Sequence, residues 1–418
     1  MADGSPSPTR GALSGLKVLD MTRILAGPSA TQILGDLGAD VVKVERPGVG
    51  DDTRKWGPPY LTDADGGDTT ESGYYLSANR NKRSLAIDFT IPEGAALIRR
   101  LAGEADVLVE NYKVGNLDRY GLGYKQLKSE LPGLIYCSIT GFGMTGPYAS
   151  RAGYDFLIQA MGGIMSITGV PDGEPMKIGV AVADLMTGMY ATVGILAALN
   201  HRRETGEGQH IDLSLLDAQV AMLNNAGQYF LTAGAPPARF GNGHPMIVPY
   251  QAFRAADQHI ILAVGNDGQF AKFCAAAGRD DLAADPRFVR NADRVRNREV
   301  LIPIIAGLIA ERPSAFWLSE LEARGVPCGP INDIAQVFAD SQVIAREMKV
   351  AIDHPAAGRK IDLIASPLKM SATPATLTRH PPMNGEHSAA ILADWLGMEG
   401  GEIAALEGRG VIAGREKA

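Results

Sequence analysis

The sequence predicts an α/β protein with a large domain built on a doubly wound parallel sheet and a smaller α/β domain. Continuous apolar strands alternate with amphipathic helices over residues 17–142, a pattern typical of a parallel sheet covered on both faces. The chain has 418 residues, which is too long for one ordinary compact core. A Gly- and Pro-rich stretch at residues 234–245 separates this first part from a second run of strands and helices.

The large domain is expected to begin with a β-α-β unit. Its strands are KVLDM and VVKVE, and the helical stretch SATQILGDLGAD lies between them. The pattern then repeats as strand SLAIDF, helix PEGAALIRRLAGEA, strand DVLVENY, helix YKQLKSEL and strand LIYCSITGF. Residues 178–230 are predicted to be mainly helical, with the short strand HIDLSL interrupting them.

The second unit has predicted strands near QAFRA and HIILAVG and predicted helices near DGQFAKFCAAA, REVLIPIIAGLIAE and SAFWLSELEARG, and it ends at the turn VPCGP. Strands VAIDH and IDLIA and a closing helix near HSAAILADWLG are expected to return to the large domain. The predicted division is therefore 1–233 and 336–418 for the large domain and 234–335 for the linker and small domain. The Pro/Ser-rich start, residues 1–15, is expected to be a loose arm.

Composition and charge exclude several classes of protein. The net charge of -7 argues against a nucleic-acid binder. Three widely spaced cysteines fit neither a disulfide framework nor a zinc site, which predicts a reducing, cytoplasmic location. The start lacks the apolar core of a secretory signal, and residues 178–200 predict a buried helix rather than a membrane span. The sequence has no His-x-Glu metal pattern and no GxSxG elbow, so neither a metal site nor serine-hydrolase chemistry is predicted.

Asp184 is the candidate catalytic residue. It is the only acidic or basic side chain between Ile178 and Asn200, so burial of this segment places a carboxylate in apolar surroundings. A structural interpretation is that Asp184 caps the helix that follows it. A chemical interpretation is that the helix N-terminus favours the ionised carboxylate and keeps a nucleophile ready at neutral pH. The two interpretations are compatible, and both remain open at this point.

Cations and Gly-rich backbone gather at the predicted carboxyl ends of the strands, where ligands of such sheets bind. Arg23 follows the first strand, Arg46 follows the second, and Lys113 follows the fourth. Each alone is better explained as a solvated surface charge, but their shared edge favours phosphate binding, as CoA would require. The full set of candidate phosphate-binding cations is Arg23, Arg46, Arg54, Lys82, Arg83, Lys113 and Arg119.

Several long segments in order resemble the class III CoA-transferase family, the group of formyl-CoA and carnitine CoA-transferases. They include GLKVLDMTRILAGPSATQILGDLGADVVKVERPGVGDDTR, ADVLVENYKVGNLDRYGLGY, SITGFGMTGP, VADLMTGMYATVGILAAL and TGEGQHIDLSLLDA. The resemblance implies that Asp184 is the nucleophile and that a homodimer of two interlocked, ring-like chains forms. Together, the strand ends and the resemblance give these candidate CoA contacts: Arg23, Ile24, Arg46, Asn111, Tyr112, Lys113, Arg119, Thr140 and Gly141. Thr140 departs from the Lys that formyl-CoA transferase has at this position.

The segments IVPYQAF, VGNDGQFAKFC and RAGYDFLIQAMGGIMSITG are similar to succinyl-CoA:glutarate and related dicarboxylate CoA-transferases. The resemblance implies transfer of CoA from an acyl-CoA, notably succinyl-CoA, to a dicarboxylic acid through an aspartyl-CoA thioester. CoA and acyl-CoA are then substrates, and no permanently bound cofactor is expected. The expected partners are an acyl-CoA, a small carboxylic acid and a second copy of the chain, with no nucleic acid and no membrane.

Three alternative functions are weighed against this one. An α-methylacyl-CoA racemase shares the family fold, but racemases place a His where this chain has Tyr154 in the segment AGYD. A NADP-dependent oxidoreductase is suggested by the β-α-β start, but the first turn, TRILAGP, lacks GxGxxG. A non-catalytic CoA-ester binder would need no buried carboxylate, and Asp184 argues against it.

Overall fold

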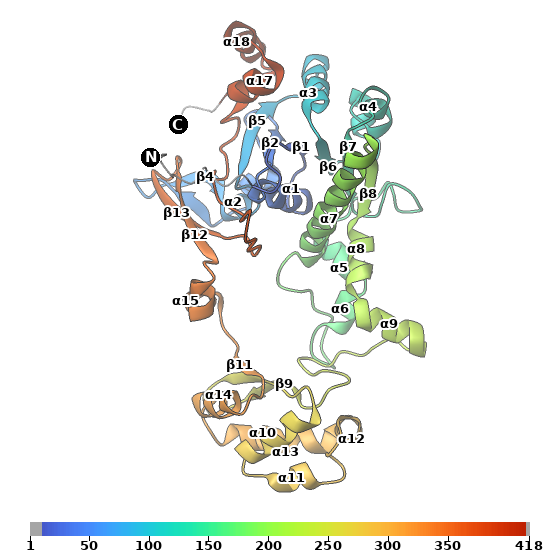
Figure 1. Cartoon of the computed structure of the whole chain (residues 1–418), viewed down its shortest axis with the longest axis vertical. Coiled ribbons are helices and arrows are strands. Elements are labelled where there is room, and N and C mark those ends of the chain that lie inside the picture. Colours follow the sequence, from blue (N-terminus) through green and yellow to red (C-terminus); the bar gives the residue numbers. More distant parts are fainter. Residues whose placement is uncertain (1–10, 415–418) are drawn as a thin grey trace, which may run out of the picture. The chain divides into compact units, whose positions relative to one another are not determined.

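The computed structural model describes residues 11–414, which form two compact units (Figure 1). The first unit contains residues 11–163, 178–228 and 342–414, and the second contains residues 164–177 and 229–341. These boundaries lie near the predicted ones at 233/234 and 335/336, with residues 164–177 as an additional part of the second unit. Most of the arm predicted at residues 1–15 lies outside the described residues.

A seven-stranded sheet forms the centre of the first unit, in the order β14-β5-β2-β1-β6-β7-β8. All neighbours are parallel except β14, which pairs antiparallel with β5 at the edge. The six parallel strands cross the sheet in chain order 3-2-1-4-5-6, so the doubly wound sheet predicted from the sequence is confirmed. The strands are β1 Lys17–Met21, β2 Asp40–Glu45, β5 Lys82–Ile87, β6 Val107–Glu110, β7 Ile135–Thr140, β8 His210–Ser214 and β14 Ile412–Ala413.

Helices cover both faces of this sheet because alternate strand residues point to opposite sides. Leu19 and Met21 of β1 pack with α3, α4, α17 and α18, whereas Val18 packs with α1, α5, α7 and α8. Two hydrophobic cores result, one on each face. The helices are α1 Ala26–Asp36, α3 Pro92–Glu104, α4 Tyr124–Glu130, α5 Asp155–Met161, α7 Val182–Thr205, α8 Leu215–Met222, α17 Ser388–Leu396 and α18 Gly400–Gly408.

Helix α7 is long and apolar enough to cross a membrane by length and composition, and the bent pair Arg298–Ala310 and Ser314–Ala323 passes the same test together. Only one side of α7 is buried, however. Ala183, Ala191 and Ile195 lie in the core, and α7 approaches α1 closely at Gly188, where a Cβ would meet the carbonyl oxygen of Ala26 at 2.7 Å. The prediction of a buried helix therefore holds for this side of α7.

Smaller elements complete the first unit. Two antiparallel hairpins occur, β3 Tyr60–Thr62 with β4 Asp68–Ser72, and β12 Lys349–His354 with β13 Arg359–Ile364. The hairpin β3–β4 was not predicted, whereas β12 and β13 match the predicted strands VAIDH and IDLIA. Short helical segments are η1 Asp52–Lys55, α2 Gly73–Ser77, η2 Leu117–Tyr120 and α16 Ser341–Ala345, the last of which starts at the unit boundary.

The second unit contains a three-stranded antiparallel sheet in the order β11-β10-β9. Its core includes Phe253, Phe273 and Trp317. The segment VPCGP, predicted as a turn, contributes strand β11 instead, because three of its residues pair with β10. The elements are β9 Tyr250–Arg254, β10 His259–Ala263, β11 Cys328–Pro330, α6 Ile164–Ile167, α10 Asp267–Ala276, α11 Asp280–Ala284, α12 Asn291–Arg296, α13 Arg298–Ala310, α14 Ser314–Ala323 and α15 Ile334–Ala339, while α9 Asn224–Ala233 spans the boundary.

Candidate active site

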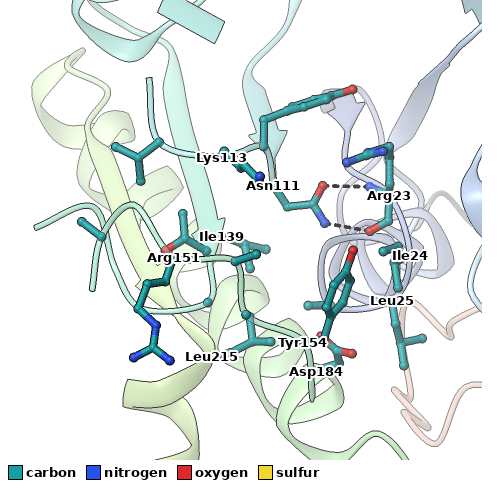
Figure 2. Close-up of a pocket in the computed structure, with 18 residues that line it drawn as sticks. Arg23, Ile24, Leu25, Asn111, Lys113, Ile139, Arg151, Tyr154, Asp184 and Leu215 are labelled. Carbon is teal, nitrogen blue, oxygen red and sulfur yellow. Dashed lines mark hydrogen bonds between the residues drawn. The ribbon is translucent and has the colours of Figure 1, made fainter. Parts of the chain in front are cut away.

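The candidate site lies where the strand order of the large sheet reverses, between β1 and β6. Open α/β sheets bind ligands in the crevice beyond the carboxyl ends of the strands at this switch point. Arg23 and Ile24 follow β1, and Asn111 follows β6. A cavity of about 140 Å³ opens there, and Figure 2 shows Asp184 and Tyr154 on its lining together with these residues.

The structure brings most of the predicted site residues together. Seven of the predicted CoA contacts line the cavity with Asp184, and Arg46 lines an adjoining cavity of about 210 Å³ that also includes Arg23 and Tyr112. Arg119 lies exposed on η2 and lines neither cavity. The seven that share the cavity with Asp184 are Arg23, Ile24, Asn111, Tyr112, Lys113, Thr140 and Gly141.

Asp184 lies in the first turn of α7 but does not cap it, which corrects the capping interpretation. The N-cap residue is Ala181, and the cap is supplied by Asp155 of α5 instead. Asp155 Oδ1 accepts hydrogen bonds from the backbone N–H groups of Ala183 at 2.8 Å and Asp184 at 3.4 Å. Within residues 11–414, no side chain or backbone group donates a hydrogen bond to the Asp184 carboxylate. The carboxylate is thus available to a ligand.

The environment of Asp184 disfavours its ionised form. Burial, and secondarily the negative charge of Asp155, raise the pKa of Asp184 from 3.8 to about 7. Asp184 also lies in the first turn of α7, where the helix N-terminus favours the ionised form, so burial and the second carboxylate act against the helix dipole. A carboxylate with a pKa near neutral is a stronger base, and a stronger nucleophile, than an ordinary Asp.

The candidate cations divide into two groups. Arg23 is partly exposed, pairs with Asp52 at 2.8 Å and lies over the Tyr112 ring, and its buried Nε has no hydrogen-bond partner within the described part of the chain. Arg54, Lys82 and Arg83 are instead buried in ion pairs, so they are neither surface charges nor free to bind phosphate. Their partners are Glu45 and Glu71 for Arg54, Asp20 for Lys82, and Asp40 and Asp394 for Arg83.

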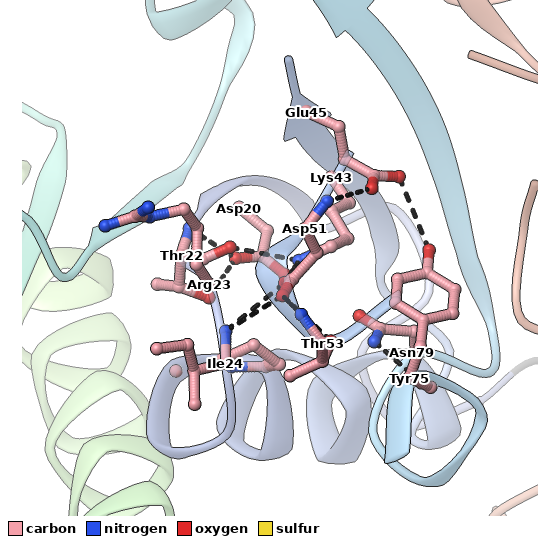
Figure 3. A network of polar contacts seen from close by, with 12 residues as sticks. Asp20, Thr22, Arg23, Ile24, Lys43, Glu45, Asp51, Thr53, Tyr75 and Asn79 are labelled. Atoms are coloured by element: carbon pink, nitrogen blue, oxygen red, sulfur yellow. Dashed lines mark hydrogen bonds and ion pairs between the residues drawn. The ribbon is translucent and has the colours of Figure 1, made fainter. Parts of the chain in front are cut away.

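A network of buried charges lies on the α1 side of the sheet, next to the turn that follows β1 (Figure 3). Lys82 Nζ donates to Asp20 at 3.0 Å, and Lys43 Nζ donates to Asp51 at 2.8 Å. Burial alone would raise the pKa of Asp20, but Lys82 and Lys43 outweigh it and lower that pKa to about 2. These carboxylates are therefore ionised at neutral pH and hold the strand ends through charge-assisted bonds.

Two residues of this site were not found from the sequence. Asp51 accepts a hydrogen bond from Ile24, which lies 27 residues away in the chain, and Asp155 accepts one from Ala183, which lies 28 residues away. The available sequence signal for Asp155 is its place next to Tyr154 in the segment AGYD. Asp51 lies in the segment GDDTR, next to a second aspartate, and no local pattern distinguishes the two.

Fold and site together define a class: a doubly wound α/β protein whose strand-end crevice contains a partly buried carboxylate beside Arg and Lys side chains. The chain belongs to CoA-transferase family III, whose family model matches residues 13–388. The resemblance predicted from the sequence motifs is thereby confirmed, and the chain is an enzyme of the CoA-transferase class.

Several characterised relatives match nearly the whole chain. The succinate–glutarate CoA-transferase of Agrobacterium fabrum is 50% identical over 91% of this chain and 95% of its own length. The human succinyl-CoA:glutarate CoA-transferase is 44% identical over 96% of this chain and 90% of its own. A crystal structure of a CAIB/BAIF family protein from Brucella suis superposes with a TM-score of 0.82 at 49% identity, covering 92% of this chain and all of that one.

Proposed function

We propose that this enzyme transfers CoA from succinyl-CoA to a dicarboxylic acid, with Asp184 as the covalent nucleophile. The observation that carries the proposal is the carboxylate of Asp184, which receives no hydrogen bond within the described residues and lines the switch-point cavity. Relatives named for glutarate with succinate or succinyl-CoA, at 43–50% identity, support the substrate class. CoA and acyl-CoA act as substrates rather than as a permanently bound cofactor.

In the first half-reaction, an Asp184 carboxylate oxygen attacks the thioester carbon of succinyl-CoA, and the C–S bond breaks to release CoA thiolate. The thiolate then attacks the Asp184 carbonyl carbon of the mixed anhydride, which forms an aspartyl-CoA thioester and releases succinate. In the second half-reaction, the acceptor carboxylate displaces CoA from Asp184, and the thiolate then attacks the acceptor carbonyl carbon. The products are the new acyl-CoA and the regenerated Asp184 carboxylate, without any oxidant or reductant.

We propose that CoA lies across the two adjoining cavities. Arg23, Arg46 and Lys113 supply positive charge toward its phosphates. The Nε of Arg23, buried without a partner among residues 11–414, is a donor that a phosphate oxygen would satisfy. Asn111, Tyr112, Thr140, Gly141 and Ile24 are proposed to contact the rest of the CoA chain, whereas Arg119 contributes only if CoA extends beyond the two cavities.

The proposal is tested by mass spectrometry of the Asp184 peptide after incubation with succinyl-CoA. We expect a CoA adduct on this peptide in the wild-type enzyme. Asp184→Asn should form no adduct and lose at least about 10³-fold in transfer rate, while calorimetry still detects CoA binding. Asp155→Asn is the matched control, because it removes the other acid at the same helix end and should keep the adduct. Turnover that survives in Asp184→Asn would contradict the covalent mechanism.

The racemase alternative requires a second acid–base group beside Asp184. Tyr154, and not a histidine, occupies that place in the cavity lining. We therefore expect no deuterium exchange at the α-carbon of a 2-methylacyl-CoA in deuterated buffer. Exchange in the absence of CoA transfer would favour the racemase instead.

We further propose that two copies form an interlocked homodimer in the cytoplasm, with the sequence-predicted domains, 1–233 with 336–418 and 234–335, as its parts. The side of α7 that faces away from its core is apolar: Leu185, Met189, Tyr190 and Val193 are 40–59% exposed, and a second copy would cover them. Light scattering should give twice 44.2 kDa for the wild type. Val193→Glu should yield monomer, whereas Arg203→Glu near the end of α7 should not. A monomeric wild type would contradict the dimer.

A further inference from the structure

The turn that follows β1 contains an isoleucine in an unfavourable backbone conformation. Ile24 has a φ of 72°, in the left-handed region that β-branched residues strongly avoid. Such a conformation persists only where surrounding groups hold it in place. Ile24 lines the cavity that contains Asp184, so this turn forms part of the wall of the candidate site (Figure 2).

One buried carboxylate holds the backbone of Ile24 directly. The Ile24 N–H lies 3.2 Å and 3.3 Å from the two carboxylate oxygens of Asp51, which is 1% exposed. Asp51 is itself fixed, because Lys43 Nζ donates to it at 2.8 Å and the Thr53 N–H donates at 3.0 Å. The same Lys43 Nζ donates to the carbonyl of Thr22 at 3.0 Å (Figure 3). The Lys43–Asp51 ion pair therefore binds the turn at Thr22 through Lys43 and at Ile24 through Asp51.

The middle of the turn is held from the other side of the switch point. The Arg23 N–H donates to Asn111 Oδ1 at 2.9 Å, and Asn111 Nδ2 donates to the Arg23 carbonyl at 2.7 Å. Asn111 follows β6, whereas Asp51 and Lys43 belong to the β2 side of the sheet. The turn is therefore hydrogen-bonded to residues from both halves of the doubly wound sheet.

We propose that Asp51 is a positioning residue for CoA transfer. It holds Ile24 in the left-handed conformation, and this sets the part of the cavity wall that Ile24 and Leu25 form. Without the Asp51 acceptor, Ile24 relaxes toward ordinary backbone angles and the wall shifts relative to Asp184. A displacement of about 1 Å at a reacting centre is enough to cost about a hundredfold in rate. The inference rests on the proposed Asp184 chemistry.

The test is a rescue experiment on the first half-reaction. The rate of CoA-adduct formation on Asp184 is measured in single turnovers with succinyl-CoA for Asp51→Ala, alone and combined with Ile24→Gly or Ile24→Ala. Both Ile24 changes remove the side chain, but only glycine adopts a positive φ without penalty. We expect Asp51→Ala to slow the step by about 10- to 100-fold. Ile24→Gly should bring the double variant to within about threefold of Ile24→Gly alone, whereas Ile24→Ala should not rescue.

Equal rates for the two double variants, or an undiminished rate in Asp51→Ala, would overturn the proposal. If Asp51→Ala fails to fold, the comparison moves to the single variants with Asp51 present. At a position with ordinary backbone angles, a glycine variant has a lower melting temperature than an alanine variant. A higher melting temperature for Ile24→Gly than for Ile24→Ala would support a left-handed conformation at residue 24. The opposite order would refute it. If the wild-type enzyme forms no adduct, the proposed Asp184 chemistry is refuted instead. The comparison of melting temperatures still tests whether residue 24 is held in the left-handed conformation.

Discussion

Asp184 and Asp155 place two carboxylates at the N-terminal turn of α7, and this pairing predicts the pH dependence of adduct formation. Burial and Asp155 raise the pKa of Asp184 to about 7, and only the ionised form is a nucleophile. The rate of adduct formation should therefore fall about tenfold per unit below pH 7. Asp155→Asn removes one negative charge and should move the midpoint to lower pH in a pH profile.

The control for this profile is Glu207→Gln, which removes an exposed acid just beyond the C-terminal end of α7. Its midpoint should match that of the wild type. A midpoint in Asp155→Asn that stays in place or moves upward would show that the two carboxylates do not interact.

The same raised pKa predicts that the proposed nucleophile costs stability. A group whose pKa is higher in the folded state stabilises the fold below its unfolded pKa and loses that contribution as the pH rises through its folded pKa. For Asp184 this window runs from 3.8 to about 7. At pH 8, the free energy of unfolding of Asp184→Asn should exceed that of the wild type by up to about 4 kcal/mol. The variant should therefore melt at a higher temperature than the wild type.

Near pH 4 the wild type and Asp184→Asn should melt at similar temperatures, since both side chains are then largely neutral when folded. A difference that does not depend on pH would mean that the amide gains new hydrogen bonds rather than relieving a buried charge.

At the scale of single residues, the sequence identified Asp184 because one acid in an apolar segment is a composition signal. It could not separate the cations that line the cavities from those buried in ion pairs. Lys82 and Arg54 were candidates like Arg23, but Lys82 pairs with Asp20, and Arg54 pairs with Glu45 and Glu71. Such pairing depends on strand neighbours, which no local pattern reveals.

At the scale of elements, helix α7 depends on α5 for its cap, and this dependence can be measured. Asp155→Ala removes the acceptor for the N–H groups of Ala183 and Asp184, whereas Asp155→Asn keeps an oxygen in the same place. Because both variants lose the charge, the difference between their free energies of unfolding measures the contribution of the capping hydrogen bonds. We expect the alanine variant to be less stable by about 1 kcal/mol in chemical denaturation. Equal midpoints would show that α7 needs no cap from α5.

The long strands and helices were predictable because hydrophobic period and Gly or Pro boundaries mark them over many residues. Strand β14 has two residues and β11 has three, which is too short for any period. Their strand character comes from pairing with β10 and β5, which also pair with the longer strands β9 and β2. Short edge strands of this kind are determined by tertiary contacts.

At the scale of the whole molecule, one buried arginine joins three distant parts of the first unit. Arg54 of η1 pairs with Glu45 of β2 at 2.8 Å and Glu71 of β4 at 2.7 Å, and it donates to the carbonyl of Pro382 at 2.8 Å. Burial alone would raise the pKa of Glu45, but Arg54 outweighs it and lowers that pKa to about 2. This pair therefore stabilises the fold above pH 4.5, and the contribution is lost as the pH falls toward 2.

Arg54→Met should consequently destabilise the first unit by about 3–5 kcal/mol at pH 7, because Glu45 and Glu71 remain buried without their partner. The measurement is urea denaturation followed by circular dichroism. Arg409→Met, which breaks an exposed pair with Glu93, is the control and should leave the midpoint unchanged. The deficit of Arg54→Met should shrink as the pH falls from 4.5 toward 2, since the wild type then loses the same ion pair. A deficit that stays constant over this range would mean that Arg54 acts through packing on Tyr75 rather than through its charge.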